Sequence, residues 1–459
     1  MNWSDKHILI IGAARQGLAL SRYLVRQGAK VTINDNRTSD QLQSSIAALE
    51  NLPVYWSLGG HPISLLDNID LISVSGGVPL DLPILIEAGK RNIPITNDTQ
   101  IFMEIVPCPV IGITGSAGKT TTTSLVGEIA KLALSPKHTA WVGGNIGKPL
   151  IDLVEKIKKD DLVILELSSF QLDQMTISPH IAAITNITPN HLDRHGTLEA
   201  YTAAKAHILD YQTHKDIAIL NQDDEGAWNL KDKVKGELHS FSIHPLSPSM
   251  NGAFLKNNQL YIQMDGKQTD ICNKSEIKLR GEHNIMNILS VCAISQAIGF
   301  SAEVMRTAIL SFKGVEHRLE FVRTWNGAKW YNDSIATAPE RTIAAIQAFD
   351  EPIILLLGGK DKNLPWDKLA QLVHQKVDHV VIFGHAAEKI RQALYIDSSS
   401  ERPYSITCCK KMIDAVHAAS RITKPGQVVL LSPGGTSYDE FIDFAERGER
   451  YREWVHKLQ

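Results

Sequence analysis

The strongest chemical signal in this 459-residue chain is a glycine-rich segment that leads into a lysine and a run of threonines. An apolar strand over residues 110–114 precedes it, and an apolar-periodic helix follows it. The segment contains Gly115, Ser116, Ala117, Gly118, Lys119, Thr120 and Thr121. In such a loop the backbone N–H groups face an anion, a lysine reaches the terminal phosphates and a threonine hydroxyl binds Mg2+. Although the glycine spacing differs from the common pattern, the segment predicts a site for a nucleoside triphosphate.

Two further polar groups stand where buried strands end. Glu166 follows the apolar residues 162–165, and His191 lies in the loop after the strand predicted over 181–185. In phosphate-loop enzymes an acid at the end of such a strand orients the metal ion. The alternatives are that Glu166 caps a helix and that His191 is an ordinary structural donor. Because both follow strands near the phosphate loop, we expect them beside Thr120 in a magnesium site.

The first 37 residues predict a strand, a turn, a helix and a second strand, which is a Rossmann-like opening. Gly12 and Gly17 bound the turn, but Ala14 replaces the middle glycine that usually lets a pyrophosphate approach. Asp35 stands where a ribose hydroxyl is usually bound. This pattern leaves three alternatives open, namely a dinucleotide, another nucleotide such as a UDP sugar, and a purely structural turn.

Alternating strand and helix signals along most of the chain predict an α/β fold with three domains. We expect a Rossmann-like domain over 1–107, a central ATPase-like domain with a parallel sheet over 108–314, and a Rossmann-like domain over 315–459. Residues 237–278 read as a β-rich peripheral part without chemistry. In the last domain, polar or glycine-rich stretches at 332–334, 358–362 and 432–437 end predicted strands, where open α/β sheets bind ligands.

Composition narrows the class of partners. The chain has 47 basic and 50 acidic residues and a net charge of −3, without a long run of one sign, so neither nucleic acid nor a membrane surface is expected as a partner. Its five cysteines show no C-x-x-C spacing, which argues against zinc and against a disulfide framework. No stretch reaches the roughly 18 apolar residues of a membrane span. We expect an unprocessed, cytoplasmic monomer that acts on small molecules.

Taken together, these residues resemble the Mur ligase family of peptidoglycan synthesis. The resemblance rests on motifs that follow in order along nearly the whole chain: residues 112–120, 166–172, 186–194, 201–205, 283–284, 317–318 and 332–334. The stretch from Leu431 to Phe441 and the motif that begins at Phe444 resemble the glutamate-adding branch of the family.

The resemblance implies a ligase that binds a UDP-sugar peptide on its first domain, ATP on its second and the incoming amino acid mainly on its third. The expected substrates are UDP-N-acetylmuramoyl-L-alanine and D-glutamate, with L-glutamate as the alternative. In this family ATP phosphorylates the substrate carboxylate, and the amine then attacks the acyl phosphate. Such a scheme agrees with the predicted site, since Mg2+ and lysine disperse the charge of a transferring phosphoryl group.

The resemblance also implies roles for single residues. Lys119 and Thr120 match phosphate and Mg2+ contacts, Glu166 a ligand of one Mg2+ and His191 a ligand of a second, while Lys205 matches a lysine that the family carbamylates. Matches to the ATP site are Asn287, Arg318 and Asp333. Matches to the UDP-sugar site are Arg15, Gln16, Gly17, Asp35, Arg37, Gly77 and Asn145, and matches to the glutamate site are Thr337, Lys362, Ser437 and Phe444.

Two positions depart from the family pattern. Ala117 stands where an asparagine is usual, and Ile335 stands where a lysine is usual after Asn-Asp-Ser. The second departure removes a cation near the expected glutamate site, and we expect Lys362, Ser437 and Lys360 to supply the remaining polar contacts.

Three rival functions remain at this stage. A folylpolyglutamate-synthetase-like ligase shares the phosphate loop but does not need residues 1–107. A nucleotide-dependent binding switch gives no reason for the polar strand ends of a third domain. An NAD oxidoreductase is the third rival, and it would need bound nicotinamide.

Overall fold

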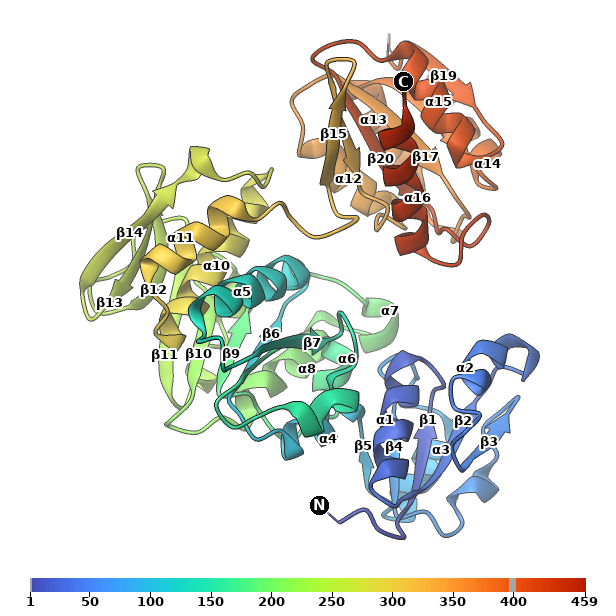
Figure 1. Ribbon diagram of the computed structural model, residues 1–459, viewed down its shortest axis with the longest axis vertical. Coiled ribbons are helices and arrows are strands. Elements are labelled where there is room, and N and C mark those ends of the chain that lie inside the picture. The colour runs from blue at the N-terminus through green and yellow to red at the C-terminus, as the bar shows by residue number, and fades with distance from the viewer. Residues whose placement is uncertain (1, 396–401) are drawn as a thin grey trace. The chain divides into compact units, whose positions relative to one another are not determined.

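The computed structural model describes residues 2–395 and 402–459, which divide into two compact units. The first unit runs to Ile277 and resumes over His283–Ser311, and the second comprises Lys278–Glu282 and Phe312–Gln459. The described residues form three sheets flanked by helices (Figure 1), which confirms the predicted α/β class. The domain limits near 107 and 314 stay predictions, because the contacts group the first two sheets into one unit.

The N-terminal sheet is parallel and has the strand order β3-β2-β1-β4-β5. Its strands are β1 (His7–Ile11), β2 (Lys30–Asp35), β3 (Val54–Leu58), β4 (Leu71–Val74) and β5 (Ile95–Thr96). The helices are α1 (Arg15–Arg26), α2 (Gln43–Ala47), α3 (Pro83–Lys90) and α4 (Asp98–Ile105). The order of the strands reverses between β1 and β4, so the loops that follow these two strands border the crevice in which such sheets bind ligands.

The central sheet has the order β14-β13-β12-β11-β10-β9-β6-β8-β7. Its strands are β6 (Val110–Thr114), β7 (Ala140–Gly144), β8 (Leu162–Glu166), β9 (Ile181–Ile184), β10 (Ile217–Asn221), β11 (Glu237–Ser242), β12 (Asn251–Lys256), β13 (Gln259–Met264) and β14 (Lys267–Asn273). The strands from β7 across to β12 are parallel, whereas β12, β13 and β14 pair antiparallel. The β-rich character predicted for residues 237–278 is therefore correct.

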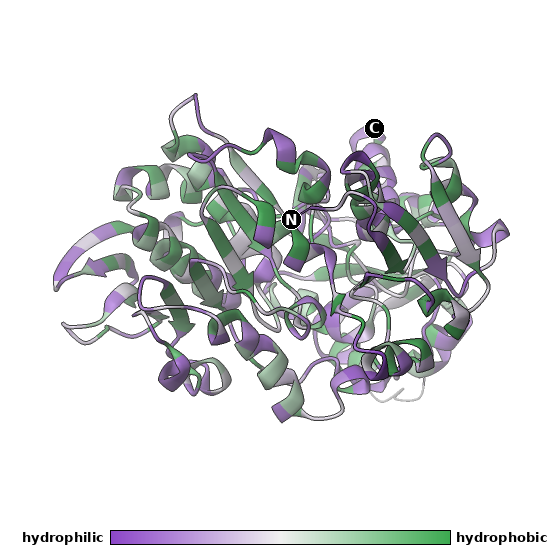
Figure 2. Cartoon of the chain, turned by 90° about the horizontal axis from the view of Figure 1, so that it is seen from below, coloured by the Kyte–Doolittle hydropathy of each residue, from purple (hydrophilic) through white to green (hydrophobic). Residues whose placement is uncertain are grey.

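Helices cover both faces of the central sheet (Figure 1). They are α5 (Lys119–Ala133), α6 (Ser169–Leu172), α7 (Leu192–His195), α8 (Leu198–Asp210), α9 (Glu225–Trp228), α10 (Glu282–Ile298) and α11 (Ala302–Ser311). The strand segments are largely hydrophobic, while loops and outer helix positions are hydrophilic (Figure 2). Because β6 lies between β8 and β9, the loops that follow these three strands emerge side by side at one edge of the sheet.

The C-terminal sheet has the order β15-β16-β20-β17-β18-β19, with only β15 antiparallel among the described strands. Its strands are β15 (Glu320–Trp325), β16 (Ala328–Asn332), β17 (Ile353–Gly358), β18 (Val377–Phe383), β19 (Ser405–Cys408) and β20 (Val428–Gly434). The helices are α12 (Pro339–Gln347), α13 (Asp367–Lys376), α14 (Ala387–Tyr395), α15 (Met412–Ile422) and α16 (Phe444–Lys457). The polar stretches predicted after β16, β17 and β20 are neighbours, because these three strands are adjacent.

Two predictions from composition can be compared with the structure. All five cysteines are free thiols, as expected for a chain without a disulfide framework. Within residues 2–395 and 402–459, no helix is long and apolar enough to cross a membrane.

Candidate active site

The loop between β6 and α5 has the backbone of a phosphate-binding turn. Gly115 and Gly118 adopt φ angles of 153° and 83°, which side chains other than hydrogen rarely allow. A Cβ atom at Gly115 would collide with Thr185, and one at Gly118 would collide with the side chain of Asn287. Both glycines are therefore required by backbone conformation and by close approach. Asn287, predicted to contact ATP, packs directly against this loop.

Lys119 begins helix α5 and folds back over the loop. Its Nζ atom donates to the carbonyl oxygens of Gly115 and Ser116 at 2.7 and 3.2 Å. The N–H of Ala117 donates to Oδ1 of Asn186 at 2.8 Å, which ties the loop to the segment after β9. The ammonium group thus lies at the mouth of the loop, where the terminal phosphates of a nucleotide would bind.

Glu166 lies at the end of β8 and is 2% exposed. Its two carboxylate oxygens accept hydrogen bonds from the Thr120 hydroxyl at 2.8 Å and from Nδ2 of Asn145 at 2.9 Å. The alternative that Glu166 caps a helix is wrong, because Ser168 caps α6 and forms a capping box with Gln171. The buried carboxylate therefore faces the first turn of the phosphate-loop helix.

Lys205 extends from α8 to the back of the same loop and is 1% exposed. Its Nζ atom donates to the Gly115 carbonyl at 2.9 Å and to the Thr114 hydroxyl at 3.3 Å. Burial lowers the pKa of this amine well below its ordinary value, and the charge of Lys119 lowers it further, against the opposing charge of Glu166. The neutral form of this amine is therefore easier to reach than that of an exposed lysine.

His191 stands in the loop after β9 with a left-handed φ of 54°. Its ring packs edge-on against Phe170, with centroids 5.2 Å apart. Partial burial lowers the pKa of its imidazole, and the positive charges of Lys119 and Lys205 lower this pKa further. The negative charge of Asp193 acts in the opposite direction and raises the pKa. A neutral imidazole in range of both lysines is suited to binding a metal ion.

Arg194 joins this loop to the N-terminal sheet. Its guanidinium donates to the carbonyl oxygens of Gly77 and Val78 at 3.2 Å each and lies 4.8 Å from the centre of the Phe170 ring. His195 stacks on the same ring at 5.1 Å. Phe170 therefore organises the His191 loop, and Arg194 fixes that loop to the predicted UDP-sugar residue Gly77.

The donor set at this edge of the sheet fits Mg2+. Among the described residues, no group of three His, Cys, Asp or Glu side chains gathers as a ready metal cage. Mg2+ is instead commonly held by one or two carboxylates together with substrate phosphates. The oxygens of Thr120 and Glu166, 2.8 Å apart beside the phosphate loop, match that requirement.

In the N-terminal sheet, Asp35 is already occupied by neighbouring donors. It accepts hydrogen bonds from the backbone N–H of Ala13 at 2.8 Å and from the guanidinium of Arg37 at 2.8 and 2.9 Å. Burial alone would raise the pKa of this carboxyl, but these bonds lower it to about 2. The pair Asp35 and Arg37 therefore presents a fixed anion and a half-exposed cation at the end of β2.

The turn after β1 meets the central sheet. A Cβ atom at Gly17 would collide with the Gly12 carbonyl, so the tight turn requires this glycine. Nε2 of Gln16 donates to the Gly144 carbonyl at 2.8 Å, one residue before Asn145. The structure thus brings Gln16, Gly77 and Asn145 toward the Glu166 edge, while Arg15 is exposed at the start of α1.

In the second unit, Asp333 follows β16 and is 5% exposed. Burial raises the pKa of its carboxyl to about 6, although hydrogen bonds from the Ser432 hydroxyl at 2.8 Å and the Leu319 N–H at 3.1 Å oppose the shift. Nε of Arg318 is buried and has no hydrogen-bond partner among the described residues. The two predicted nucleotide residues of this unit therefore lie close to each other.

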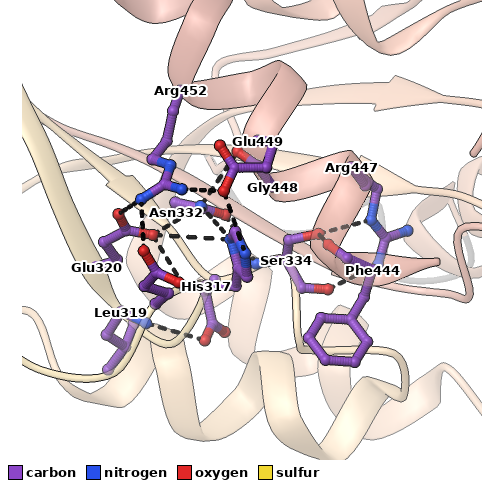
Figure 3. A network of polar contacts seen from close by, with 12 residues as sticks. His317, Leu319, Glu320, Asn332, Ser334, Phe444, Arg447, Gly448, Glu449 and Arg452 are labelled. Carbon is purple, nitrogen blue, oxygen red and sulfur yellow. Dashed lines mark hydrogen bonds and ion pairs between the residues drawn. The ribbon is translucent and has the colours of Figure 1, made fainter. Parts of the chain in front are cut away.

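A polar network holds the segment that carries Arg318 (Figure 3). Glu320 accepts hydrogen bonds from the His317 N–H, from Nδ2 of Asn332 and from Arg452, at 2.8, 2.9 and 2.8 Å. His317 and Leu319 adopt positive φ angles of 62° and 42°, which is uncommon for residues other than glycine. The network stabilises a strained backbone on both sides of Arg318.

Two of the predicted glutamate residues, Thr337 and Phe444, contact the segment after Asp333. The Thr337 N–H donates to the Ile335 carbonyl at 2.9 Å, and the Phe444 carbonyl accepts from the Ser334 hydroxyl at 2.7 Å. Ser437 is buried and Lys362 is exposed. Lys360 forms a backbone bridge with Thr436 through its main chain, and its side chain is exposed.

Several residues at these sites were not found from the sequence. Phe170, Arg194 and Ser432 each contact a predicted residue from a different part of the chain. Phe170 lies in the short helix α6, and Ser432 lies in β20. No sequence spacing marks such contacts, because they arise only when separate strand ends meet.

Comparison with known proteins identifies the family. Models of the Mur ligase MurD-like N-terminal domain, the Mur ligase middle domain and the Mur ligase glutamate ligase domain match residues 6–97, 113–295 and 317–435. The chain belongs to the Mur ligase family.

Curated relatives extend over the whole chain. Proteins named UDP-N-acetylmuramoylalanine--D-glutamate ligase from Clostridium botulinum and Clostridium tetani are each 38% identical to it, over 99% of this chain and 97% of theirs.

Solved structures share the fold. UDP-N-acetylmuramate-alanine ligase MurC from Thermotoga maritima matches with a TM-score of 0.58 and 20% identity, over 99% of this chain and 100% of that one. MurF from Acinetobacter baumannii matches with a TM-score of 0.59 and 16% identity, over 98% and 93% of the two chains.

Proposed function

We propose that this chain is an ATP-dependent ligase that joins D-glutamate to UDP-N-acetylmuramoyl-L-alanine through an acyl phosphate, in the synthesis of peptidoglycan precursors. Full-length relatives with that name support the assignment. The observation that carries it is the meeting of the phosphate loop, Glu166, His191 and Lys205 at one edge of the central sheet. This set suits phosphoryl transfer to a carboxylate, which is a poor electrophile until one oxygen becomes a leaving phosphate.

The UDP-sugar peptide is assigned to the N-terminal sheet. Arg15, Gln16, Gly17 and Gly77 border the crevice between β1 and β4, and Asn145 faces it from the central sheet. The Asp35 oxygens already accept bonds from Arg37 and Ala13, which disfavours the dinucleotide alternative. The match to a MurD-like N-terminal domain likewise disfavours a folylpolyglutamate-synthetase-like ligase.

Lys119 is assigned to the terminal phosphates of ATP, which the glycine-rich loop and the N-terminus of α5 also bind. Thr120 and Glu166 would hold one Mg2+, and His191 would help to hold a second. When bound, Mg2+ supplies positive charge that stabilises the transferring phosphoryl group. Asn287, which lies beside Gly118, is assigned to the nucleotide, and the family resemblance assigns Arg318 and Asp333 to it as well.

Lys205 is assigned as a carbamylated lysine. Burial makes the neutral form of its amine easier to reach, and a neutral amine can attack the carbon of CO2, form an N–C bond and lose a proton. The resulting carbamate places an anion where the amine stood, next to the phosphate loop. Such an anion would orient a metal ion together with His191.

The incoming amino acid is assigned to Thr337, Lys362, Ser437 and Phe444. Its amine attacks the acyl carbon and expels phosphate, so each cycle yields ADP, phosphate and an amide. We favour D-glutamate because of the relatives, and L-glutamate remains the alternative. We assign the reaction to the cytoplasm, where ATP and nucleotide sugars are found, and propose a monomer that requires no nucleic acid.

The test uses purified protein with ATP, Mg2+, UDP-N-acetylmuramoyl-L-alanine and single amino acids. Inorganic phosphate release and the mass of the product are measured for D-glutamate, L-glutamate and D-alanine. We expect product and phosphate only with D-glutamate. A preference for L-glutamate or for a non-acidic amino acid overturns the substrate assignment, and phosphate release without an amino acid points to a nucleotide switch.

A further inference from the structure

In the second unit, Arg318 and Arg341 both act on the charge of Asp333, and Arg341 also acts on Lys362. Burial lowers the pKa of Arg341, and the charge of Arg318 lowers it further, while Asp333 opposes the shift. Burial also lowers the pKa of Lys362, with the charge of Arg341 as the second cause. Arg341 is therefore within electrostatic range of Arg318, Asp333 and Lys362. Asp333 follows β16 and Lys362 follows β17, and both of these strands pair parallel with β20.

Hydrogen bonds show which residues the Arg341 guanidinium lies beside. It stands in the first turn of α12, and its guanidinium donates to the Ile335 carbonyl at 3.1 Å. The same carbonyl accepts the N–H of Thr337 at 2.9 Å. The guanidinium therefore lies beside Thr337, which is assigned to the incoming amino acid. The Arg341 side chain is exposed, so a ligand can reach its guanidinium.

The cluster carries more positive charge than its own carboxylate balances. Asp333 already accepts bonds from Ser432 and from the Leu319 N–H. Among the described residues, neither Arg341 nor Lys362 has a carboxylate within ion-pair distance, and Nε of Arg318 has no partner at all. Exposed cations without a carboxylate partner favour an anionic ligand.

We infer that Arg341 binds a carboxylate of the incoming glutamate together with Lys362, and so takes the place of the cation that is absent at position 335. The inference rests on the proposed function. A guanidinium presents a planar fork that matches a carboxylate with two parallel hydrogen bonds. The two cations reach the ligand from different elements, Arg341 from α12 and Lys362 from the loop after β17.

The test compares steady-state kinetics of the wild-type ligase with Arg341→Met, which keeps most of the side-chain length and removes the charge. We expect KM for D-glutamate to rise about 10- to 100-fold, because a charge-assisted bond to the substrate is lost. KM for ATP and for UDP-N-acetylmuramoyl-L-alanine should stay within about threefold, because the lost contact is to glutamate alone. Arg391→Met, which removes an exposed arginine on α14, is the matched control and should leave all three constants unchanged.

A compensating variant sharpens the test. Ile335→Lys in the Arg341→Met background adds a cation to the segment that Arg341 contacts. It should lower the raised KM for D-glutamate by at least about tenfold. Arg341→Gln, which keeps a donor for the Ile335 carbonyl, replaces Arg341→Met if that variant does not fold.

Three outcomes separate the possibilities. An unchanged KM for D-glutamate in a folded Arg341 variant overturns the inference. A KM for ATP that rises as much as that for D-glutamate also overturns it, because the cluster then binds phosphate. A wild-type chain that does not use glutamate at all instead overturns the proposed function.

Discussion

Replacement of Lys205 by alanine is the most direct test of the buried amine. The Nζ atom contacts only the Gly115 carbonyl and the Thr114 hydroxyl by hydrogen bonds, and it lies 4.7 Å from the centre of the Tyr201 ring. The variant therefore leaves no charged partner unpaired. It opens a cavity for which comparable large-to-small changes cost about 2–5 kcal/mol of unfolding free energy. We expect the lower end of that range, since an amine that is costly to bury is removed with the chain.

The expected loss of activity is much larger. If a carbamate on Lys205 orients a metal ion, its removal takes one fixed charge from the reacting centre, which costs about 100- to 1,000-fold in kcat. Formate or acetate fits the cavity and returns an anion, so either should restore part of the activity. Phosphate release with both substrates is the assay, and thermal unfolding reports the fold.

A control variant and two possible outcomes test the role of the Lys205 amine. Lys131→Ala removes an exposed lysine that pairs with Glu128 on α5, and it should change neither activity nor rescue. Wild-type turnover in Lys205→Ala refutes any role for this amine. A folded variant that short carboxylates cannot restore refutes the carbamate, and leaves the amine itself as the active group.

Other substitutions test neighbouring parts of the first unit. Lys119→Ala should lower phosphate release about 100- to 1,000-fold with an unchanged circular dichroism spectrum, because it removes charge at the transferring phosphoryl group and opens no apolar core. Gly118→Ala should lower the free energy of unfolding by about 1–3 kcal/mol and weaken ATP binding, because the new Cβ meets Asn287. The control Gly59→Ala has a similar φ of 84° and open space around it, so it should lose only the energy of backbone strain. Equal losses of the two variants in thermal unfolding would contradict this prediction. Burial raises the pKa of Asp98 to about 6, so the stability that its protonated form contributes is full below about pH 4 and is lost as the pH rises through 6. Asp98→Asn should thus be more stable than wild type at pH 7, by at most about 3 kcal/mol in denaturant titrations, and no more stable at pH 4.

Much of the fold was predictable because its signals are local. The change from an apolar strand to a helical period around Gly115 identifies the phosphate loop without any knowledge of distant contacts. Glu166 shows the limit of such reasoning. An acid before a helix fits both a cap and a strand end, and the choice depends on Ser168 and Gln171, which form the cap two residues later.

The parts that the sequence did not reveal depend on which strand ends meet. Arg341 is exposed in the first turn of α12, where an arginine normally has only a solvated role. Its effect on the charge of Lys362 follows from the adjacency of β16, β20 and β17, which no local pattern contains. The same holds for Arg194, whose two carbonyl partners lie more than a hundred residues earlier in the chain.

The peptide bond between Gly144 and Asn145 couples two sites that are assigned to different ligands. The Gly144 carbonyl of this peptide accepts from Gln16, which is assigned to the UDP-sugar crevice, and the Asn145 N–H of the same peptide donates to the backbone carbonyl of Glu166, which is assigned to the magnesium site. A rotation of this one peptide moves both contacts together. Two binding free energies that are linked in this way affect each other equally. If the sugar nucleotide at its assigned site changes the affinity for ATP by some factor, ATP changes the affinity for the sugar nucleotide by the same factor.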